Sequence, residues 1–336
     1  MEADLVERAG VPFEAIPAAG VHGVGWRKTP GNLWQLWRGY RQARQLLGRF
    51  RPDVLFFTGG YVAVPVALAA RASSARRLPI ALFVPDIEPG LALKTLARFA
   101  DRIAVSVEDS RAYFGRRHVT VTGYPARAEL AAWDRQAALR TLDLRADLPV
   151  LLVLGGSSGA RSLNRALLAG LPTLLAEMQI VHVSGRLDWP EVEAARATLA
   201  PELAARYRPY PYLHAELGAA FTVAGLALSR AGASTLGELP LFGLPAVLVP
   251  YPYAWRYQKV NAGFLARHGA AQVVDDQDLL TQLIPVVQGL MRDPARRESM
   301  RQAMHSLCRA GAAGSIAGLL HNLADDRQAG KGLTRD

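Results

Sequence analysis

The sequence predicts an α/β protein of two domains, each built on a parallel sheet. Short, nearly continuous hydrophobic runs alternate with helical patterns, as expected of strands buried on both faces of a parallel sheet with right-handed crossovers. These runs pause between residues 122 and 149, where a Gly123-Tyr124-Pro125 turn and a polar helical stretch indicate a domain boundary. The predicted strands cover residues 54–58, 80–84, 102–107, 119–122, 150–154, 180–183, 226–229 and 246–249.

Composition narrows the classes of function. The 336 residues are 50% hydrophobic and 20% charged, as in a globular enzyme, and no apolar run reaches the ~18 residues of a membrane span. The acidic first ten residues lack the apolar core of a signal peptide. A single cysteine, Cys308, excludes an intrachain disulfide and fits a reducing compartment. The net charge of +10 favours phosphate-bearing partners or an anionic membrane surface, and without any nucleic-acid-binding motif no nucleic-acid partner is expected.

Residues 32–50 predict an amphipathic helix with a basic, aromatic outer face. Apolar side chains recur at three- and four-residue spacing and are predicted to face the core: Leu33, Leu36, Tyr40, Ala43, Leu47 and Phe50. Tryptophan beside arginine on the other face is typical of an interfacial membrane contact, although a solvated basic face is the alternative. The residues predicted to contact a membrane are Trp26, Arg27, Lys28, Trp34, Arg38 and Arg41.

Three glycine-rich turns follow predicted strands, and in α/β sheets ligands bind at such carboxyl ends. They lie at residues 58–61, 155–159 and 231–233. The third leads into a predicted helix from Ser234 to Gly243, whose N-terminal N–H groups suit a phosphate. Glu238 could hold the two hydroxyls of a ribose, although Thr235-x-x-Glu238 also fits a capping box. None of the turns is G-x-G-x-x-G or a Walker loop, which disfavours nicotinamide and ATP enzymes.

Other polar residues carry weaker signals. Asp276-Gln277-Asp278 has the Asp-x-Asp spacing of some metal-dependent glycosyltransferases, but it precedes a predicted helix over residues 279–291 and is better explained as its cap. The histidines show no metal-ligand spacing, and His22 and His214 are expected in loops. A last helix is predicted over residues 314–324, followed by a frayed end.

The motifs GGSSGARSLN at residues 155–164 and SRAGASTLGEL at residues 229–239 resemble the MurG family. The first-half segments TGGYVAVPVALAAR and VTGYPAR belong to the same pattern, so the resemblance covers nearly the whole chain. It implies a GT-B fold, in which two Rossmann-like doubly wound domains face a cleft. The domains are expected at residues 1–128 (acceptor and membrane side) and 134–312 (UDP-GlcNAc), with a helix over 313–327 returning to the first.

The resemblance also implies an activity. It is inverting transfer of N-acetylglucosamine (GlcNAc) from UDP-GlcNAc to a membrane-bound undecaprenyl-pyrophosphoryl lipid, lipid I to lipid II, without metal or cofactor. The setting is peptidoglycan synthesis at the cytoplasmic face of the bacterial plasma membrane. The implied donor-binding residues include Ser157 at the phosphate, with Arg127 nearby, Ser158, and a diphosphate cradle formed by Ala231, Gly232, Ala233 and Ser234. The backbone at Leu213 would contact uracil, and Glu238 would bind the ribose hydroxyls. The GlcNAc hydroxyls would be bound by Gln258 and Asn261. The implied acceptor side is Thr58, Gly59, Gly60, Tyr61 and Asp86.

The chain departs from the family pattern on the acceptor side. The family's first strand and its Gly-Gly-Thr-Gly-Gly-His loop, with the presumed histidine base, are absent from this sequence, and His-Glu-Gln-Asn is replaced by Phe83-Val84-Pro85-Asp86. No general base is therefore assigned, and Asp86 and Glu88 are the nearest carboxylate candidates. Two alternatives stay open: a lipid glycosyltransferase with another acceptor such as diacylglycerol, and a catalytically inactive module that binds nucleotide sugars.

Overall fold

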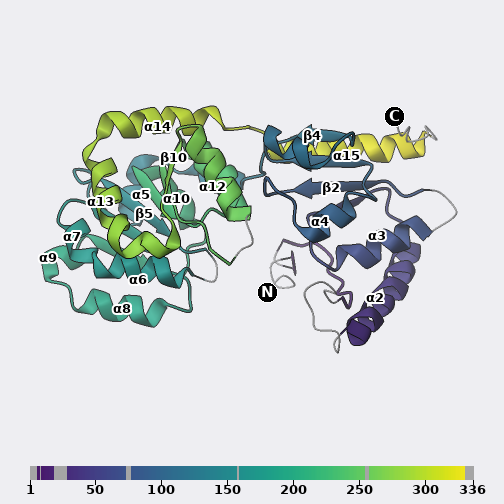
Figure 1. Ribbon diagram of the computed structural model, residues 1–336, viewed down its shortest axis with the longest axis horizontal. Coiled ribbons are helices and arrows are strands. Elements are labelled where there is room, and N and C mark those ends of the chain that lie inside the picture. Colours follow the sequence, from purple (N-terminus) through teal and green to yellow (C-terminus); the bar gives the residue numbers. More distant parts are fainter. Residues whose placement is uncertain are drawn as a thin grey trace.

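Two parallel sheets, one of four strands and one of six, form the framework of the protein (Figure 1). The computed structural model describes residues 6–7, 9–18, 29–72, 77–156, 159–253 and 257–329. The first sheet has the order β1-β2-β3-β4, with β1 (Leu55–Phe57), β2 (Ile80–Val84), β3 (Arg102–Val105) and β4 (Val119–Val121). The second has the order β10-β9-β8-β5-β6-β7, with β5 (Val150–Leu154), β6 (Gln179–Val183), β7 (Tyr207–Tyr210), β8 (Leu226–Ser229), β9 (Ala246–Leu248) and β10 (Ala271–Val273).

All eight predicted strands are present, and β2, β5 and β8 have the predicted bounds. Strands β7 and β10 were not predicted from the sequence, and both lie at the edges of the six-stranded sheet. An edge strand needs no continuous hydrophobic run, because one side of it meets solvent rather than another strand. Strand β7 contains Arg208 and Pro209, and proline is tolerated at an edge.

The helices cover these sheets as two lobes (Figure 1). The four-stranded lobe carries α2 (Thr29–Phe50), α3 (Ala63–Ala72), α4 (Leu91–Leu96) and the 3-10 helix η1 (Glu108–Tyr113). The six-stranded lobe carries η2 (Ala128–Ala132), α5 (Arg135–Thr141), α6 (Arg161–Ala169), α7 (Leu171–Leu175), α8 (Trp189–Ala197), α9 (Pro201–Ala204), α10 (Glu216–Val223), η3 (Ala233–Leu236), α11 (Glu238–Phe242), α12 (Tyr257–Arg267), η4 (Asp276–Asp278), α13 (Leu279–Arg292) and α14 (Pro294–Ser306). Buried aliphatic side chains fill both faces of its sheet.

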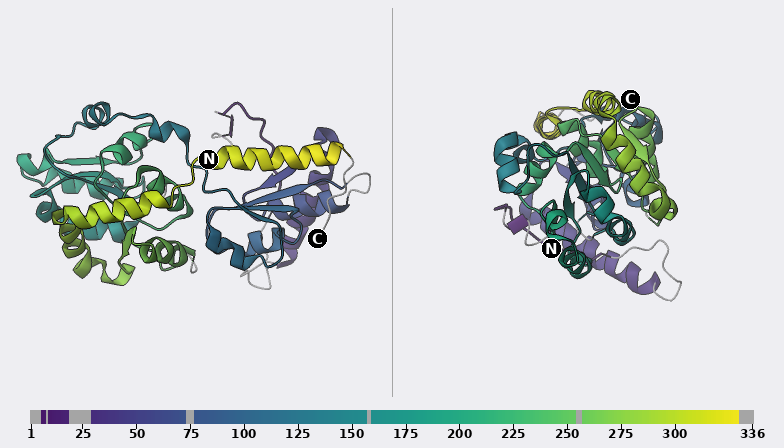
Figure 2. Two further views of the ribbon diagram at one scale, coloured as in Figure 1. Left: turned by 90° about the horizontal axis from the view of Figure 1, so that it is seen from above. Right: turned by 90° about the vertical axis from the view of Figure 1, so that its left-hand side faces the viewer.

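The last helix, α15 (Ala312–Gln328), crosses back and packs along the four-stranded sheet (Figure 2). Its Ile316 is buried against Phe83 of β2 and Ala104 of β3. The prediction that the chain frays after residue 324 is wrong, because the helix continues to Gln328 and the Arg327 guanidinium donates to the carbonyl of Pro52. The domain limits of 1–128, 134–312 and 313–327 stay predictions.

Helix α2 packs on the four-stranded lobe through its middle, and its two ends extend beyond that contact. Ala43 is fully buried and Leu47 packs into the core of the four-stranded lobe, as predicted. Leu33 and Phe50, predicted to face the core, are instead 55% and 72% exposed, because they lie near the two ends of the helix. None of the described helices is both long and apolar enough to cross a membrane.

Candidate functional site

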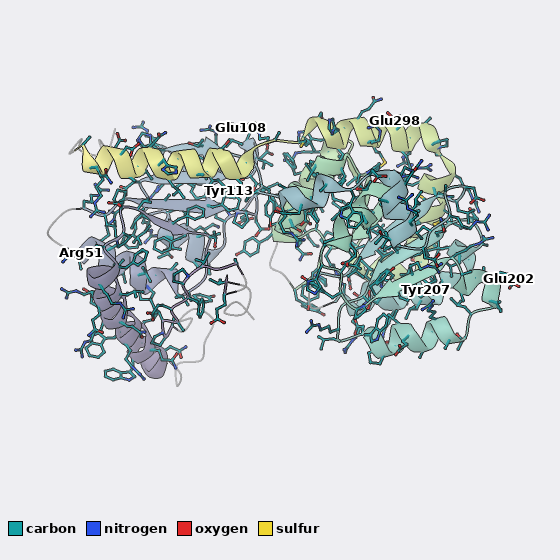
Figure 3. The ribbon with its side chains drawn as sticks, turned by 180° about the vertical axis from the view of Figure 1, so that it is seen from behind. Arg51, Glu108, Tyr113, Glu202, Tyr207 and Glu298 are labelled. Carbon is teal, nitrogen blue, oxygen red and sulfur yellow. The ribbon has the colours of Figure 1, made fainter. Side chains whose placement is uncertain are left out.

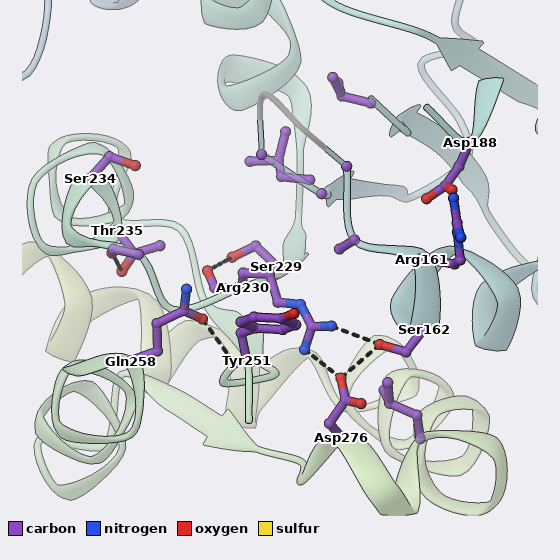
Figure 4. Close-up of a pocket in the computed structure, with 18 of the residues that line it drawn as sticks. Arg161, Ser162, Asp188, Ser229, Arg230, Ser234, Thr235, Tyr251, Gln258 and Asp276 are labelled. Atoms are coloured by element: carbon purple, nitrogen blue, oxygen red, sulfur yellow. Dashed lines mark hydrogen bonds and ion pairs between the residues drawn. The ribbon is translucent and has the colours of Figure 1, made fainter. Parts of the chain in front are cut away.

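A cavity of about 1210 Å³ opens at the carboxyl ends of the strands of the six-stranded sheet (Figure 4). Three described strands, β5, β6 and β8, line it with their own last residues, and turns after other strands add to it. Leu154 and Gly155 line it from the end of β5, Val183 from β6, Ser229 and Arg230 from β8, and Tyr251 from the turn after β9. Parallel strands bring these turns to one edge, which is why sequence segments 100 residues apart meet here.

The loop after β8 forms one wall of the cavity, but not as the single helix that the sequence predicts. Residues Ala233–Leu236 form a 3-10 turn, and α11 follows with only five residues before Gly243, whose φ of 55° ends the helix. The break falls at Gly237, where a Cβ would lie 2.7 Å from the Tyr124 side chain. A helix this short has a small dipole, so an anion at this wall would depend on individual N–H groups.

The predicted capping box is not formed. Thr235 Oγ1 donates to the Gly232 carbonyl at 2.6 Å, and α11 has no side-chain cap hydrogen bond among the residues described. Glu238 instead lines the cavity. Burial raises the pKa of its carboxyl, while a hydrogen bond from Ser234 and the nearby Arg127 guanidinium lower it. The carboxylate is therefore partly desolvated, as suits an acceptor for paired hydroxyl groups.

Of the other predicted donor residues, Leu213, Gly232, Ser234 and Gln258 line the cavity. Gln258 Oε1 accepts from the Tyr251 N–H at 2.8 Å (Figure 4). Arg127, Ala231, Ala233 and Asn261 are not among the described lining residues, although the charge of Arg127 reaches Glu238. Ser157 and Ser158 lie outside the described residues.

An ion pair in the lining of the cavity was not predicted from the sequence. Arg230 Nη1 lies 2.5 Å from Asp276 Oδ1, and the Ser162 hydroxyl donates to the same carboxylate at 2.7 Å (Figure 4). The Arg230 side chain is only 10% exposed and also bonds the Val249 carbonyl. The prediction that this acidic segment caps the following helix is wrong, because Asp278 at the start of α13 makes no side-chain cap hydrogen bond within the described chain.

A buried polar chain leads from the core to the same cavity. The Tyr207 hydroxyl, inside the six-stranded lobe (Figure 3), lies 2.7 Å from His182 Nδ1, and His182 Nε2 lies 3.0 Å from Asn164 Oδ1. Asn164 Nδ2 donates to Asp188 Oδ2 at 2.9 Å, and Asp188 Oδ1 accepts from Arg161 at the cavity wall. Since Asn164 presents its oxygen to the ring, Nε2 carries a proton and donates it to Asn164. Burial lowers the pKa of His182 to about 3.

The residues predicted for the acceptor side lie in the four-stranded lobe, outside the described lining of the cavity. Thr58, Gly60 and Tyr61 are exposed. Asp86 follows β2 and accepts from Asn261 Nδ2 at 2.8 Å, and burial raises the pKa of its carboxyl. Glu88 is buried and lies 3.3 Å from Lys94 Nζ.

The aromatic face of α2 is exposed as predicted. Trp34 is 57% exposed and stacks on Trp37, with ring centroids 4.8 Å apart. The Arg41 guanidinium lies 5.0 Å from the Trp37 ring, and Arg38 is exposed on the same helix. Trp26, Arg27 and Lys28 lie outside the described residues.

Comparison with known proteins gives both halves of the chain the same assignment. The glycosyltransferase family 28 N-terminal domain matches residues 1–105, and the family 28 C-terminal domain matches residues 150–313. A UDP-N-acetylglucosamine--N-acetylmuramyl-(pentapeptide) pyrophosphoryl-undecaprenol N-acetylglucosamine transferase of Roseiflexus sp. is 41% identical, covering 98% of this chain and 82% of the relative. The protein of the same name from Desulforamulus reducens is 36% identical, covering 94% and 86%.

Solved structures share the fold. The crystal structure of Acinetobacter baumannii MurG aligns with a TM-score of 0.72 at 24% identity, covering 96% of this chain and 88% of that one. A UDP-GlcNAc 2-epimerase from Neisseria meningitidis aligns with a TM-score of 0.65 at 11% identity, covering 96% and 88%. The two parallel sheets agree with these GT-B neighbours. Because the identity to curated relatives reaches 41% over nearly its whole length, this protein belongs to the MurG family of GT-B glycosyltransferases.

Proposed function

We propose that this protein transfers GlcNAc from UDP-GlcNAc to a membrane-bound pyrophosphoryl lipid, converting lipid I to lipid II with inversion at the sugar. The observation that carries the proposal is the cavity at the carboxyl edge of the six-stranded sheet, where Leu213, Glu238 and Gln258 converge. The names of the curated relatives support the same donor and acceptor.

In this proposal UDP-GlcNAc binds across the cavity, and each of its parts contacts a different wall. Uracil lies against Leu213, the ribose hydroxyls bind the Glu238 carboxylate, and the diphosphate lies at residues 231–234 beside Gly155 and Gly156. The sugar extends toward Gln258 on α12, the helix whose Asn261 donates to Asp86 of the other lobe. Attack of the acceptor oxygen from that side forms the new bond to the sugar carbon with inversion and breaks the bond to UDP, while the proton of the attacking hydroxyl passes to a base on the acceptor side.

The negative charge of the leaving diphosphate is stabilised mainly by backbone N–H groups. Among the described lining residues, the three cations Arg161, Arg165 and Arg230 are matched by three anions, Asp188, Glu238 and Asp276, so the lining side chains carry no formal excess charge. The N–H groups at the start of the 3-10 turn have no partner within the turn and can stabilise the developing charge. The proposal therefore involves no metal ion.

The lipid acceptor places the enzyme at the cytoplasmic face of the plasma membrane, and α2 supplies the contact. Its exposed tryptophans and neighbouring Arg38 and Arg41 combine an interfacial ring pair with cations that attract anionic headgroups. We expect a Trp34→Ser/Trp37→Ser variant to lose flotation with vesicles of anionic lipid, whereas Phe50→Ser, at the other end of α2, retains it. Equal flotation of the double variant and the wild type would contradict this contact.

Calorimetric titration with UDP-GlcNAc and with UDP, alongside turnover of a lipid I analogue, tests the transferase. The wild-type chain should bind both nucleotides and release UDP only with the acceptor. Gln258→Ala should weaken UDP-GlcNAc about tenfold while leaving UDP binding unchanged, because one hydrogen bond to an uncharged sugar hydroxyl is lost. Gln35→Ala on the exposed face of α2 is the matched control. The absence of any UDP-GlcNAc binding would refute the proposal, and binding with turnover of diacylglycerol instead would replace its acceptor.

A further inference from the structure

A hydrogen-bonded relay runs through the interior of the six-stranded lobe and ends at Asp188 in the cavity wall. The Tyr207 hydroxyl lies 2.7 Å from His182 Nδ1, and His182 Nε2 lies 3.0 Å from Asn164 Oδ1. Asn164 Nδ2 then donates to Asp188 Oδ2 at 2.9 Å. Each of these four residues is at most 4% exposed. Together their side chains form the relay.

The relay has one direction, and Asp188 is its final acceptor. Asn164 Nδ2 also donates to the Ser184 carbonyl at 2.9 Å, so both groups on that side of the amide are acceptors and the amide orientation is fixed. Its oxygen therefore accepts from His182 Nε2 on the other side. From the cavity, Arg161 Nε donates to Asp188 Oδ1 at 2.9 Å (Figure 4). A carboxylate accepts from both ends, whereas an amide in its place would turn an N–H toward one donor.

Asp188 does not cap the helix at whose start it lies. It is the N-cap residue of α8, a position where an aspartate ordinarily accepts from an N–H of its own helix. Within the described chain its side chain makes no such bond. Both of its oxygens instead accept from α6, through Asn164 and Arg161. The carboxylate of Asp188 therefore serves the segment that follows β5 rather than α8.

The same groups clamp the glycine-rich turn between β5 and α6. Gly159 has a φ of 84°, and its N–H donates to the Gly156 carbonyl at 3.1 Å. A Cβ at Gly159 would lie 2.7 Å from the Ser184 carbonyl oxygen and 3.4 Å from Asp188 Oδ2. These are the two acceptors that the Asn164 amide joins. Because both glycines line the cavity, the relay supports the wall beside which the diphosphate is proposed to lie.

We propose that Asp188 is a positioning residue, which through the relay holds the glycine-rich turn in the shape that receives the donor diphosphate. The role rests on the proposed function, because it assumes that the diphosphate of UDP-GlcNAc lies beside this turn. Charge alone predicts the opposite effect, since removing the Asp188 anion would leave Arg161 without its counter-ion and attract a phosphate. The sign of the change in UDP affinity therefore separates positioning from simple electrostatics.

The experiment compares UDP with uridine by calorimetric titration. Asp188→Asn removes the charge at nearly constant volume. It should weaken UDP about tenfold, because the turn that faces a charged phosphate loses its support, and should leave uridine, which has no phosphate, unchanged. Tyr207→Phe, at the far end of the relay, should weaken UDP about threefold, because one neutral hydrogen bond is lost. Tyr210→Phe, the same change on the same strand outside the relay, is the matched control and should bind UDP as the wild type does.

A double variant tests whether the four side chains act as one unit. Asp188→Asn/Tyr207→Phe should bind UDP no more weakly than Asp188→Asn, because the relay is already broken at its end. Additive losses would overturn the proposal, and so would tighter or unchanged UDP binding, or an equal loss of uridine affinity, in Asp188→Asn. Thermal unfolding identifies a variant that fails to fold, and the comparison of Tyr207→Phe with Tyr210→Phe then decides. These results overturn the role of Asp188 alone, whereas a wild-type chain that binds no UDP would overturn the proposed function as well.

Discussion

The ion pair between Arg230 and Asp276 should stabilise the six-stranded lobe, and removing its acidic partner measures by how much. Deleting one member of a buried pair costs about 3–5 kcal/mol, because the other charge stays buried without compensation. Here Arg230 is 10% and Asp276 21% exposed, and the guanidinium keeps its bonds to Val249 and Ser162. We therefore expect Asp276→Ala to lower the free energy of unfolding by the lower figure, about 3 kcal/mol.

Thermal unfolding followed by circular dichroism gives the measurement. For a domain of this size, about 2–4 °C is lost per kcal/mol, so the midpoint should fall by about 6–12 °C. Asp278→Ala is the control, since a helix cap at Asp278 would contribute about 1 kcal/mol and the structure shows no such bond. If Asp276→Ala destabilises the protein no more than Asp278→Ala does, the assignment of the ion pair is refuted.

Three further predictions concern single side chains. Glu238→Gln should weaken UDP-GlcNAc binding about tenfold in calorimetry. Because the pKa of Glu238 is raised above the ordinary glutamate value of 4.5, the wild-type affinity should begin to fall at a higher pH than it would with an ordinary glutamate. A pH-independent affinity would contradict this. The pKa of His182 falls from 6.5 to about 3 on folding, so its contribution to the free energy of unfolding is fully present above pH 6.5 and is lost as the pH falls toward 3, by about 2 kcal/mol at pH 5. Urea unfolding of the wild type should show this dependence of the free energy of unfolding on pH. An identical pH dependence in His182→Gln would exclude the assignment. Gly237→Ala places a Cβ 2.7 Å from Tyr124 and should destabilise the protein by about 1–3 kcal/mol. Gly289→Ala, whose Cβ meets nothing within 4 Å, should not destabilise it. Equal unfolding midpoints of the two variants would count against the close packing at Gly237.

The strands and the sheet edge at which the cavity opens could be predicted because their signals are local. Residues 150–154 and 226–229 are continuous apolar runs bounded by glycine-rich turns, which is enough to identify buried parallel strands and the loops at their carboxyl ends. Residues 207–210 and 271–273 gave no such signal, because edge strands are short and tolerate polar residues and proline.

The break in the predicted helix after residue 234 shows why local patterns are not sufficient. Apolar and small residues continue to Gly243, which ends the helix as expected. At the interruption, Tyr124, which lies more than 100 residues earlier in the sequence, packs where a Cβ of residue 237 would lie, so that only glycine fits there. Crowding by a distant side chain leaves no trace in the periodicity of the segment itself.

The sequence by itself determined the fold class, the sheet edge at which the cavity opens, and several of the cavity residues, including Leu213, Glu238 and Gln258, through turn chemistry and family motifs. Only the tertiary structure decided which charges neutralise one another and which polar groups remain available. The Arg230–Asp276 pair spans 46 residues, and the Asn261–Asp86 bond spans 175. The physical reason is that periodicity records which side of an element is buried, whereas hydrogen bonds and ion pairs form only once packing brings distant elements together.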